Sequence, residues 1–74
     1  MKTMFRLEAI EPNLRLVIDG RVIEELCLSI SRHGQREPIL IHQQNMSFKI
    51  TDGEKRWRAI KKNGQPTIIA ELEK

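Results

Sequence analysis

Residues 51–62 read TDGEKRWRAIKK, a loop that leads directly into a basic helix, and the other predicted elements can be arranged around it. Asp52 is a residue type that caps helices, and Gly53 has no Cβ atom, which leaves its main chain open to close approach. Free N–H groups at a helix start and the positive end of the helix dipole both favour an anion. This stretch therefore predicts a phosphate site at Gly53.

Two sets of side chains in this helix have different predicted roles. Trp57 and Ile60 are three residues apart and are expected to face the core. Arg56 and Arg58 lie one turn after the first residues of the helix, so both cations could converge with the N-terminal amides on one bound anion.

Acidic residues flank the glycine. Asp52 is expected to cap the helix and Glu54 to complement its dipole. Alternatively, the two carboxylates could hold a magnesium ion through water beside a bound phosphate. No structural metal is predicted, because no Cys/His set has zinc-ligand spacing; His33 and His42 are nine residues apart.

Apolar patterns on either side of this stretch predict four strands. The first alternates with a period of two, the second and fourth are short apolar runs, and the third places Phe48 and Ile50 on one face. The predicted strands are Phe5–Ile10, Pro38–His42, Ser47–Thr51 and Thr67–Leu72. Residues 43–46 are expected to form a hairpin turn, and residues 14–18 an irregular connector.

A first helix is predicted between the first two strands. Asp19 and Gly20 can cap it, and Gly34 can end it as the left-handed residue after the last turn. One stripe of apolar residues recurs at spacings of three and four and predicts the face that packs on the core. The stripe consists of Ile23, Leu26, Cys27 and Ile30. Cys27 is therefore interpreted as a buried hydrophobe rather than a reactive thiol.

The chain length predicts a single domain, residues 1–74, because 74 residues cannot support two cores. The order β-α-β-β-α-β indicates the α+β class, with two helices packed on one face of a small mixed sheet. No apolar run approaches the roughly 20 residues that span a bilayer. We therefore expect no membrane association. A single cysteine cannot form an internal disulfide, which predicts a cytoplasmic protein.

The net charge of +3 comes from one segment of the chain. Residues 1–37 carry six basic and six acidic side chains, whereas residues 38–74 carry seven basic and four acidic ones. Five of those seven are Lys55, Arg56, Arg58, Lys61 and Lys62. This concentration predicts a nucleic-acid-binding surface; the alternative is a solvated helix face.

In their order and spacing, these motifs resemble the N-terminal domain of the ParB family, in the ParB and sulfiredoxin superfamily. The resemblance covers most of the chain: IEPN at 10–13, IEELCLSISRHGQREPILI at 23–41, TDGEKRWRAIKKNG at 51–64 and TIIA at 67–70. DGEKRWRA is similar to the family's glycine, glutamate, arginine, arginine box, and HGQREPILI to the loop and strand after its first helix. The implied fold is ParB/sulfiredoxin-like.

The resemblance also implies a nucleotide site between these two loops, for CTP or another nucleotide with Mg²⁺. The glycine-led box contacts the triphosphate in ParB proteins, a role that falls here on Gly53, Glu54, Lys55 and Arg56. The first loop contacts the base and sugar, which points to Ser29, Gly34, Gln35 and Pro38. The implied setting is plasmid or chromosome partition, or a related DNA-associated regulatory protein, acting as a homodimer or with further domains of a longer protein.

Several positions depart from the family. Glu37 stands where the family often has glutamine, His42 where it often has arginine, and Lys55 replaces the first arginine of the box. The family's further phosphate- and magnesium-binding segment and its helix-turn-helix domain follow the last strand and have no counterpart in residues 1–74.

An enzyme of the same fold is the alternative. Sulfiredoxin carries a catalytic cysteine in the loop where this chain has Glu54, and Cys27 is in another element, so sulfinic acid reduction is not expected. Related domains include a free-serine kinase and ParB-like nucleases. For such chemistry Glu54 would be the catalytic carboxylate, and Glu37 is the other nearby candidate.

Overall fold

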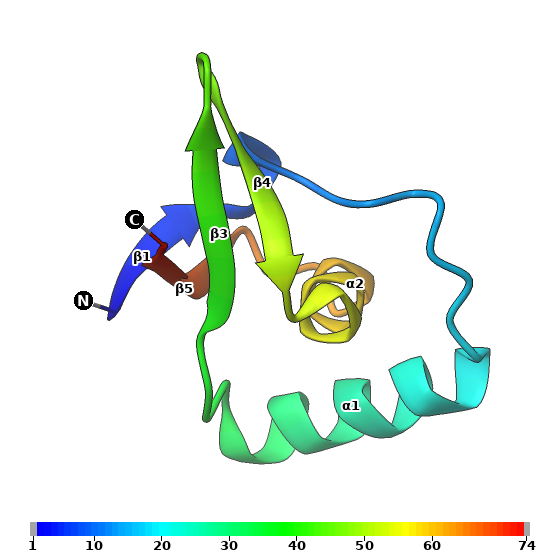
Figure 1. Ribbon diagram of the computed structural model, residues 1–74. Helices are drawn as coiled ribbons and strands as arrows, with labels where there is room; N and C mark the ends of the chain where they lie inside the picture. The colour runs from blue at the N-terminus through cyan, green and yellow to red at the C-terminus, as the bar shows by residue number, and fades with distance from the viewer. Residues whose placement is uncertain (1, 74) are drawn as a thin grey trace.

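A five-stranded mixed sheet carries two helices on one side in the computed structural model, which describes residues 2–73 (Figure 1). The strands are β1 (Lys2–Arg6), β2 (Ile10–Glu11), β3 (Ile39–Gln44), β4 (Ser47–Asp52) and β5 (Thr67–Leu72). The helices are α1 (Gly20–His33) and α2 (Glu54–Lys62), and a 3₁₀ turn, η1, spans Leu7–Ala9. The α+β class, the mixed sheet and the two predicted helices are confirmed.

The strand order is β1-β5-β3-β4-β2. β1 runs antiparallel to β5, β5 parallel to β3, β3 antiparallel to β4, and β4 parallel to β2. The hairpin between β3 and β4 is tighter than predicted, because β3 continues to Gln44 and the turn is made by Asn45, with φ of 58°, and Met46. β5 has the predicted bounds.

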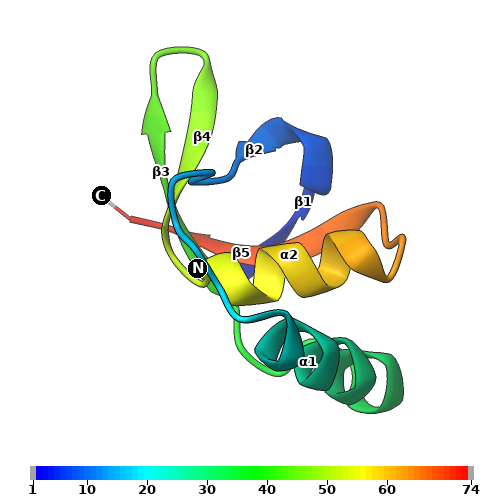
Figure 2. The ribbon, with the colours of Figure 1, turned by 90° about the vertical axis from the view of Figure 1, so that its right-hand side faces the viewer.

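The predicted first strand, Phe5–Ile10, is wrong, because the chain changes direction inside it. The amide of Leu7 donates to the carbonyl of Pro66 at 2.9 Å and the Leu7 side chain is buried, which ends the pairing of β1 with β5. The 3₁₀ turn joins β1 directly to β2 (Figure 2). Ile10 of β2 then pairs with Phe48 of β4, at the other end of the strand order. The alternation of apolar residues reflects two separate strands rather than one.

α1 has the predicted ends. The Asp19 carboxylate accepts a hydrogen bond from the Arg21 amide at 2.9 Å, and Gly34 ends the helix with φ of 76°. α2 begins differently: Asp52 is the last residue of β4 and pairs with Leu40, so the predicted cap is wrong. The cap residue is Gly53, in a left-handed conformation and without a side-chain hydrogen bond.

α2 lies next to the strands, and α1 packs on the outer side of α2 (Figures 1 and 2). The core between these layers is formed by Ile39, Ile41, Ile68 and Ala70 of the sheet, Trp57, Ala59 and Ile60 of α2, and Ile23 and Ile30 of α1. The predicted α1 stripe is confirmed: Leu26 and Cys27 are partly buried against this core. Trp57 and Ile60 face the core as expected. Neither helix within residues 2–73 is long and apolar enough to cross a membrane.

Candidate functional site

A cleft of about 820 Å³ opens at the start of α2. Its walls come from five parts of the chain: the β4–α2 junction, the loop before β3, the segment between β2 and α1, α1 itself, and one end of the sheet. The lining includes Asn13, Leu16, Glu37, Pro38 and the run Gly53–Arg56. Segments that are more than 40 residues apart in sequence thus meet at one opening.

Gly53 is required here by the core. Its φ of 102° is in the left-handed region, which side chains disfavour. A Cβ atom at Gly53 would lie 2.7 Å from Cγ2 of Ile39, a fully buried side chain. The missing Cβ therefore allows α2 to begin directly against β3, a packing role that stands beside the predicted approach of an anion.

The first turn of α2 keeps unpaired main-chain donors. The amide of Trp57 donates to the carbonyl of Gly53 at 3.1 Å, which is the first bond of the helical pattern. The amides that precede it in a helix have no helical acceptor. Because the cap residue supplies no side chain for them, this end of the cleft has the donors and the dipole orientation that suit an anion.

Arg56 and Arg58 extend to different parts of the structure. Arg56 lines the cleft, and its Nη2 donates to Oε2 of Glu37 at 2.8 Å. Arg58 is not among the residues that line the cleft. Its Nε donates to Glu54 at 3.0 Å, and its Nη2 donates to the carbonyl of Leu16 at 2.8 Å. The convergence of both arginines on one anion is therefore not seen; only Arg56 faces the cleft.

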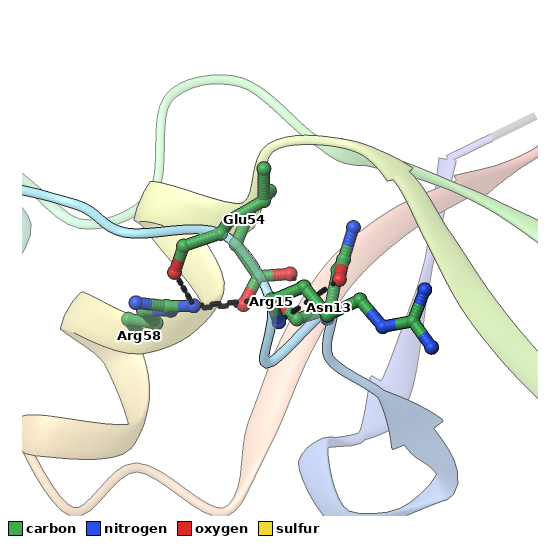
Figure 3. Close-up of polar contacts among 5 residues, drawn as sticks. Asn13, Arg15, Glu54 and Arg58 are labelled. Carbon is green, nitrogen blue, oxygen red and sulfur yellow. Dashed lines mark hydrogen bonds and ion pairs between the residues drawn. The ribbon is translucent and has the colours of Figure 1, made fainter.

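Glu54 is buried, with 6 % of its surface exposed, and both of its carboxylate oxygens are engaged. Oε1 accepts from the amide of Asn13 at 2.7 Å, and Oε2 accepts from Arg58 (Figure 3). Residues 13–16, which lie between β2 and α1 and are called the connector from here on, are thereby attached to the first turn of α2. Within residues 2–73, no three His, Cys, Asp or Glu side chains are grouped so that they could hold a metal ion.

Gln35 belongs to the β-sheet rather than to the cleft. Its side-chain oxygen accepts from the Ile69 amide at 2.8 Å, and its side-chain nitrogen donates to the Ile69 carbonyl at 2.8 Å. The first residue of β5 that pairs with β3 is Ala70, opposite Ile39. The Gln35 side chain pairs with the residue just before it on β5, Ile69. Ser29 and Gly34, the other predicted contacts to a base or sugar, also lie outside the cleft lining, whereas Pro38 is part of it.

Two of the remaining cations of α2, Lys61 and Lys62, have partners on the protein. Nζ of Lys61 lies 5.2 Å from the centre of the Trp57 ring, a cation–π distance. Nζ of Lys62 is 3.7 Å from a carboxylate oxygen of Glu24 on α1. Lys55 is exposed at the mouth of the cleft.

Sequence reasoning missed the contribution of the connector. Asn13 and Leu16 line the cleft and bind Glu54 and Arg58, although residues 14–18 were predicted only as an irregular link. The Pro12–Asn13 pair was a visible signal, because it predicts a turn and lies within the IEPN stretch. A turn motif does not say which distant residue it will contact.

Comparison with known proteins finds one matching family model and several similar relatives. A family model described as the ParB N-terminal domain matches residues 3–74. A nucleoid occlusion protein of Geobacillus thermodenitrificans is 44 % identical over 62 residues, covering 78 % of this chain and 22 % of that protein. A probable chromosome-partitioning protein ParB of Campylobacter jejuni is 35 % identical over 71 residues, covering 92 % of this chain and 26 % of that protein. The chain thus spans about a quarter or less of these relatives.

Three solved structures share the fold over all or nearly all of the chain. Sulfiredoxin from Arabidopsis thaliana matches with a TM-score of 0.90 and 29 % identity, covering 100 % of this chain and 85 % of that one. A C-terminally truncated ParB from Caulobacter crescentus, complexed with CTP-γ-S, matches with a TM-score of 0.89 and 25 % identity, covering 100 % of this chain and 44 % of that one. The same partitioning protein in complex with the centromeric parS site matches with a TM-score of 0.87 and 26 % identity, covering 97 % of this chain and 40 % of that one.

Proposed function

This chain belongs to the ParB N-terminal domain family, and from that premise we propose that it binds a nucleotide, CTP in the first place, in the cleft at the start of α2. The proposed setting is a cytoplasmic, DNA-associated protein of plasmid or chromosome partition, or a related regulator. Mg²⁺ is the proposed companion of the triphosphate. The cleft therefore has to accommodate a base, a sugar and a chain of phosphates.

The observation that carries this proposal is the meeting of two loops at one opening. The run Gly53–Arg56 and the loop of Glu37 and Pro38 line the same cleft. Its volume of about 820 Å³ lies within the range of small-molecule sites, roughly 300–1,000 Å³. The chemistry of the lining fits a triphosphate at one end, because Lys55, Arg56 and the first-turn amides of α2 are all donors.

Binding requires an exchange of partners at Arg56. Its guanidinium is paired with the carboxylate of Glu37 in the structure. The Glu37 side chain is 72 % exposed, so water can solvate that carboxylate when a phosphate takes its place. Arg56 is therefore proposed as the phosphate contact, and Pro38 as the contact nearest the base and sugar; Ser29, Gly34 and Gln35 keep their predicted roles from the family resemblance alone.

Isothermal titration of the protein with CTP, and separately with ATP, GTP and UTP, tests the proposal with and without Mg²⁺. We expect saturable binding of CTP that is lost or reduced more than tenfold in Arg56→Ala, because a charge-assisted contact to phosphate disappears. Arg32→Ala is the matched control, since Arg32 is exposed on α1 outside the cleft. Equal affinities for the wild type and Arg56→Ala would contradict the site.

The same samples distinguish the other readings. If duplex DNA displaces CTP, the cleft binds the phosphates of a nucleic acid. Release of inorganic phosphate, or cleavage of DNA, that disappears in Glu54→Gln would favour the enzyme reading. Binding of CTP without either reaction supports a nucleotide-binding domain.

A further inference from the structure

A buried ion pair connects the start of α2 to a distant segment that walls the cleft. The segment is the connector, residues 13–16, which lies between β2 and α1. Glu54 and Arg58 stand four residues apart on α2, and the distance between Oε2 of Glu54 and Nε of Arg58 is 3.0 Å. Figure 3 shows both side chains directed at the connector.

Asn13 is the point of attachment. Its amide donates to Oε1 of Glu54 at 2.7 Å, and its carbonyl accepts from Nη2 of Arg58 at 3.1 Å. The same Nη2 donates to the carbonyl of Leu16 at 2.8 Å. A single pair of side chains therefore binds the connector at both of its ends.

The connector also has internal hydrogen bonds that give it a defined shape. The side-chain oxygen of Asn13 accepts from the amide of Arg15 at 3.1 Å, which is an Asx-type turn. The Leu16 amide donates to the Asn13 carbonyl at 3.2 Å. Because the turn is formed locally and fastened at Glu54 and Arg58, it can act as a rigid wall rather than as a loose loop.

The connector lines two openings in the surface. Asn13 and Leu16 line the cleft at the start of α2. Asn13 also lines a second opening of about 560 Å³, whose other side is formed by His42 and Lys49 of the hairpin. Because Asn13 lines both openings, the position of the connector contributes to the shape of the cleft.

We propose that Glu54 and Arg58 form a positioning clip that holds the connector as a wall of the nucleotide cleft, with the paired side chains directed at the protein rather than at the ligand. Both oxygens of the Glu54 carboxylate accept hydrogen bonds from the protein, and Arg58 does not line the cleft. The clip affects the affinity for the nucleotide indirectly, because it fixes the positions of Asn13 and Leu16 in the cleft lining. This inference rests on the proposed function only for the affinity measurement.

The amide of Asn13 reports on the clip without any ligand. A short hydrogen bond to a carboxylate shifts an amide proton downfield and slows its exchange with water. We expect Glu54→Gln to move the Asn13 amide resonance upfield and to accelerate its exchange roughly tenfold or more, because the charged acceptor is lost. Arg58→Ala should also move this resonance, since it frees the neighbouring carbonyl and the Glu54 carboxylate.

Titration with CTP supplies the second measurement. Both clip variants should lose affinity for CTP. The double variant should lose no more affinity than the single variant that binds CTP less tightly, because the two residues act as one unit. Arg56→Ala is the comparison: it should lose affinity for CTP while the Asn13 resonance and its exchange stay as in the wild type. Fluorescence of Trp57, the only tryptophan, confirms that each variant is folded.

The outcomes separate the two proposals. An unchanged Asn13 amide in Glu54→Gln and Arg58→Ala overturns the clip, and so does an unchanged CTP affinity when that amide has been released. If the wild type does not bind CTP, the proposed function fails, and the Asn13 amide still decides whether the pair fastens the connector. Should Glu54→Gln fail to fold, Arg58→Lys replaces it; one ammonium cannot reach Glu54, Asn13 and Leu16 together, so the Asn13 amide should again be released.

Discussion

Glu37, in the loop that precedes β3, accepts a hydrogen bond at Oε2 from Nη2 of Arg56 on α2, at 2.8 Å. The pair places a negative charge beside the cation proposed to bind phosphate. Exposed ion pairs of this kind contribute only about 0.2–1 kcal/mol, so a bound polyanion can displace the carboxylate. We therefore expect Glu37 to lower the affinity of the cleft for the proposed nucleotide without preventing its binding.

Glu37→Gln should raise the affinity for CTP about two- to tenfold, because it frees Arg56 and removes a charge that repels phosphate. The free energy of unfolding should change by less than about 0.5 kcal/mol. Calorimetric titration and urea unfolding measure these quantities. Glu24→Gln is the matched control: Glu24 is 70 % exposed and paired with Lys62 outside the cleft, so it should leave CTP binding unchanged. An equal gain in both variants would point to net charge alone.

Gly53→Ala should destabilise the fold by about 2–4 kcal/mol, because the new Cβ atom meets Ile39 and the left-handed backbone is strained. Urea unfolding followed by Trp57 fluorescence measures the loss. Gly64→Ala has a similar φ of 74° but open space at the Cβ position, so it should cost only about 1–2 kcal/mol. Equal losses at the two glycines would show that backbone strain alone matters at Gly53.

Gln35→Ala should cost about 1–3 kcal/mol of stability, because it leaves the amide and carbonyl of Ile69 without their side-chain partners. Amide exchange at Ile69 should accelerate with it. Gln44→Ala, at an exposed position near the hairpin turn, is the control and should stay within about 0.5 kcal/mol of the wild type. If Gln35→Ala keeps full stability but loses CTP, the side chain serves the ligand.

Lys55→Ala should weaken non-specific binding to duplex DNA and reduce the slope of log K against log salt by about 1, as expected when one phosphate contact is removed. Fluorescence anisotropy at several salt concentrations measures the slope. Lys49→Ala removes the same charge on β4, outside the cleft at the start of α2, and should leave the slope unchanged. If both variants keep the wild-type slope, the basic helix face is only a solvated surface.

Local sequence signals accounted for most of the elements. The capped apolar stripe of α1 and the apolar run of β5 were predictable because helix caps and hydrophobic periodicity act over a few residues. The first strand was not, because a regular alternation of side chains does not reveal the 3₁₀ turn at Leu7–Ala9, which depends on a contact with Pro66. Similarly, Asp52 has the chemistry of a cap, but its pairing with Leu40 keeps it in β4.

The sequence by itself determined the fold class, the family and the position of the glycine-led loop, because these depend on the order and spacing of motifs along the chain. Only the tertiary structure decided what each polar residue contacts. Glu54 and Arg58 bind a connector some 40 residues away, Gln35 pairs with β5, and Arg56 is left to face the cleft. Such partners are fixed by how the layers pack, since residues that are distant in sequence become neighbours only when the core is formed.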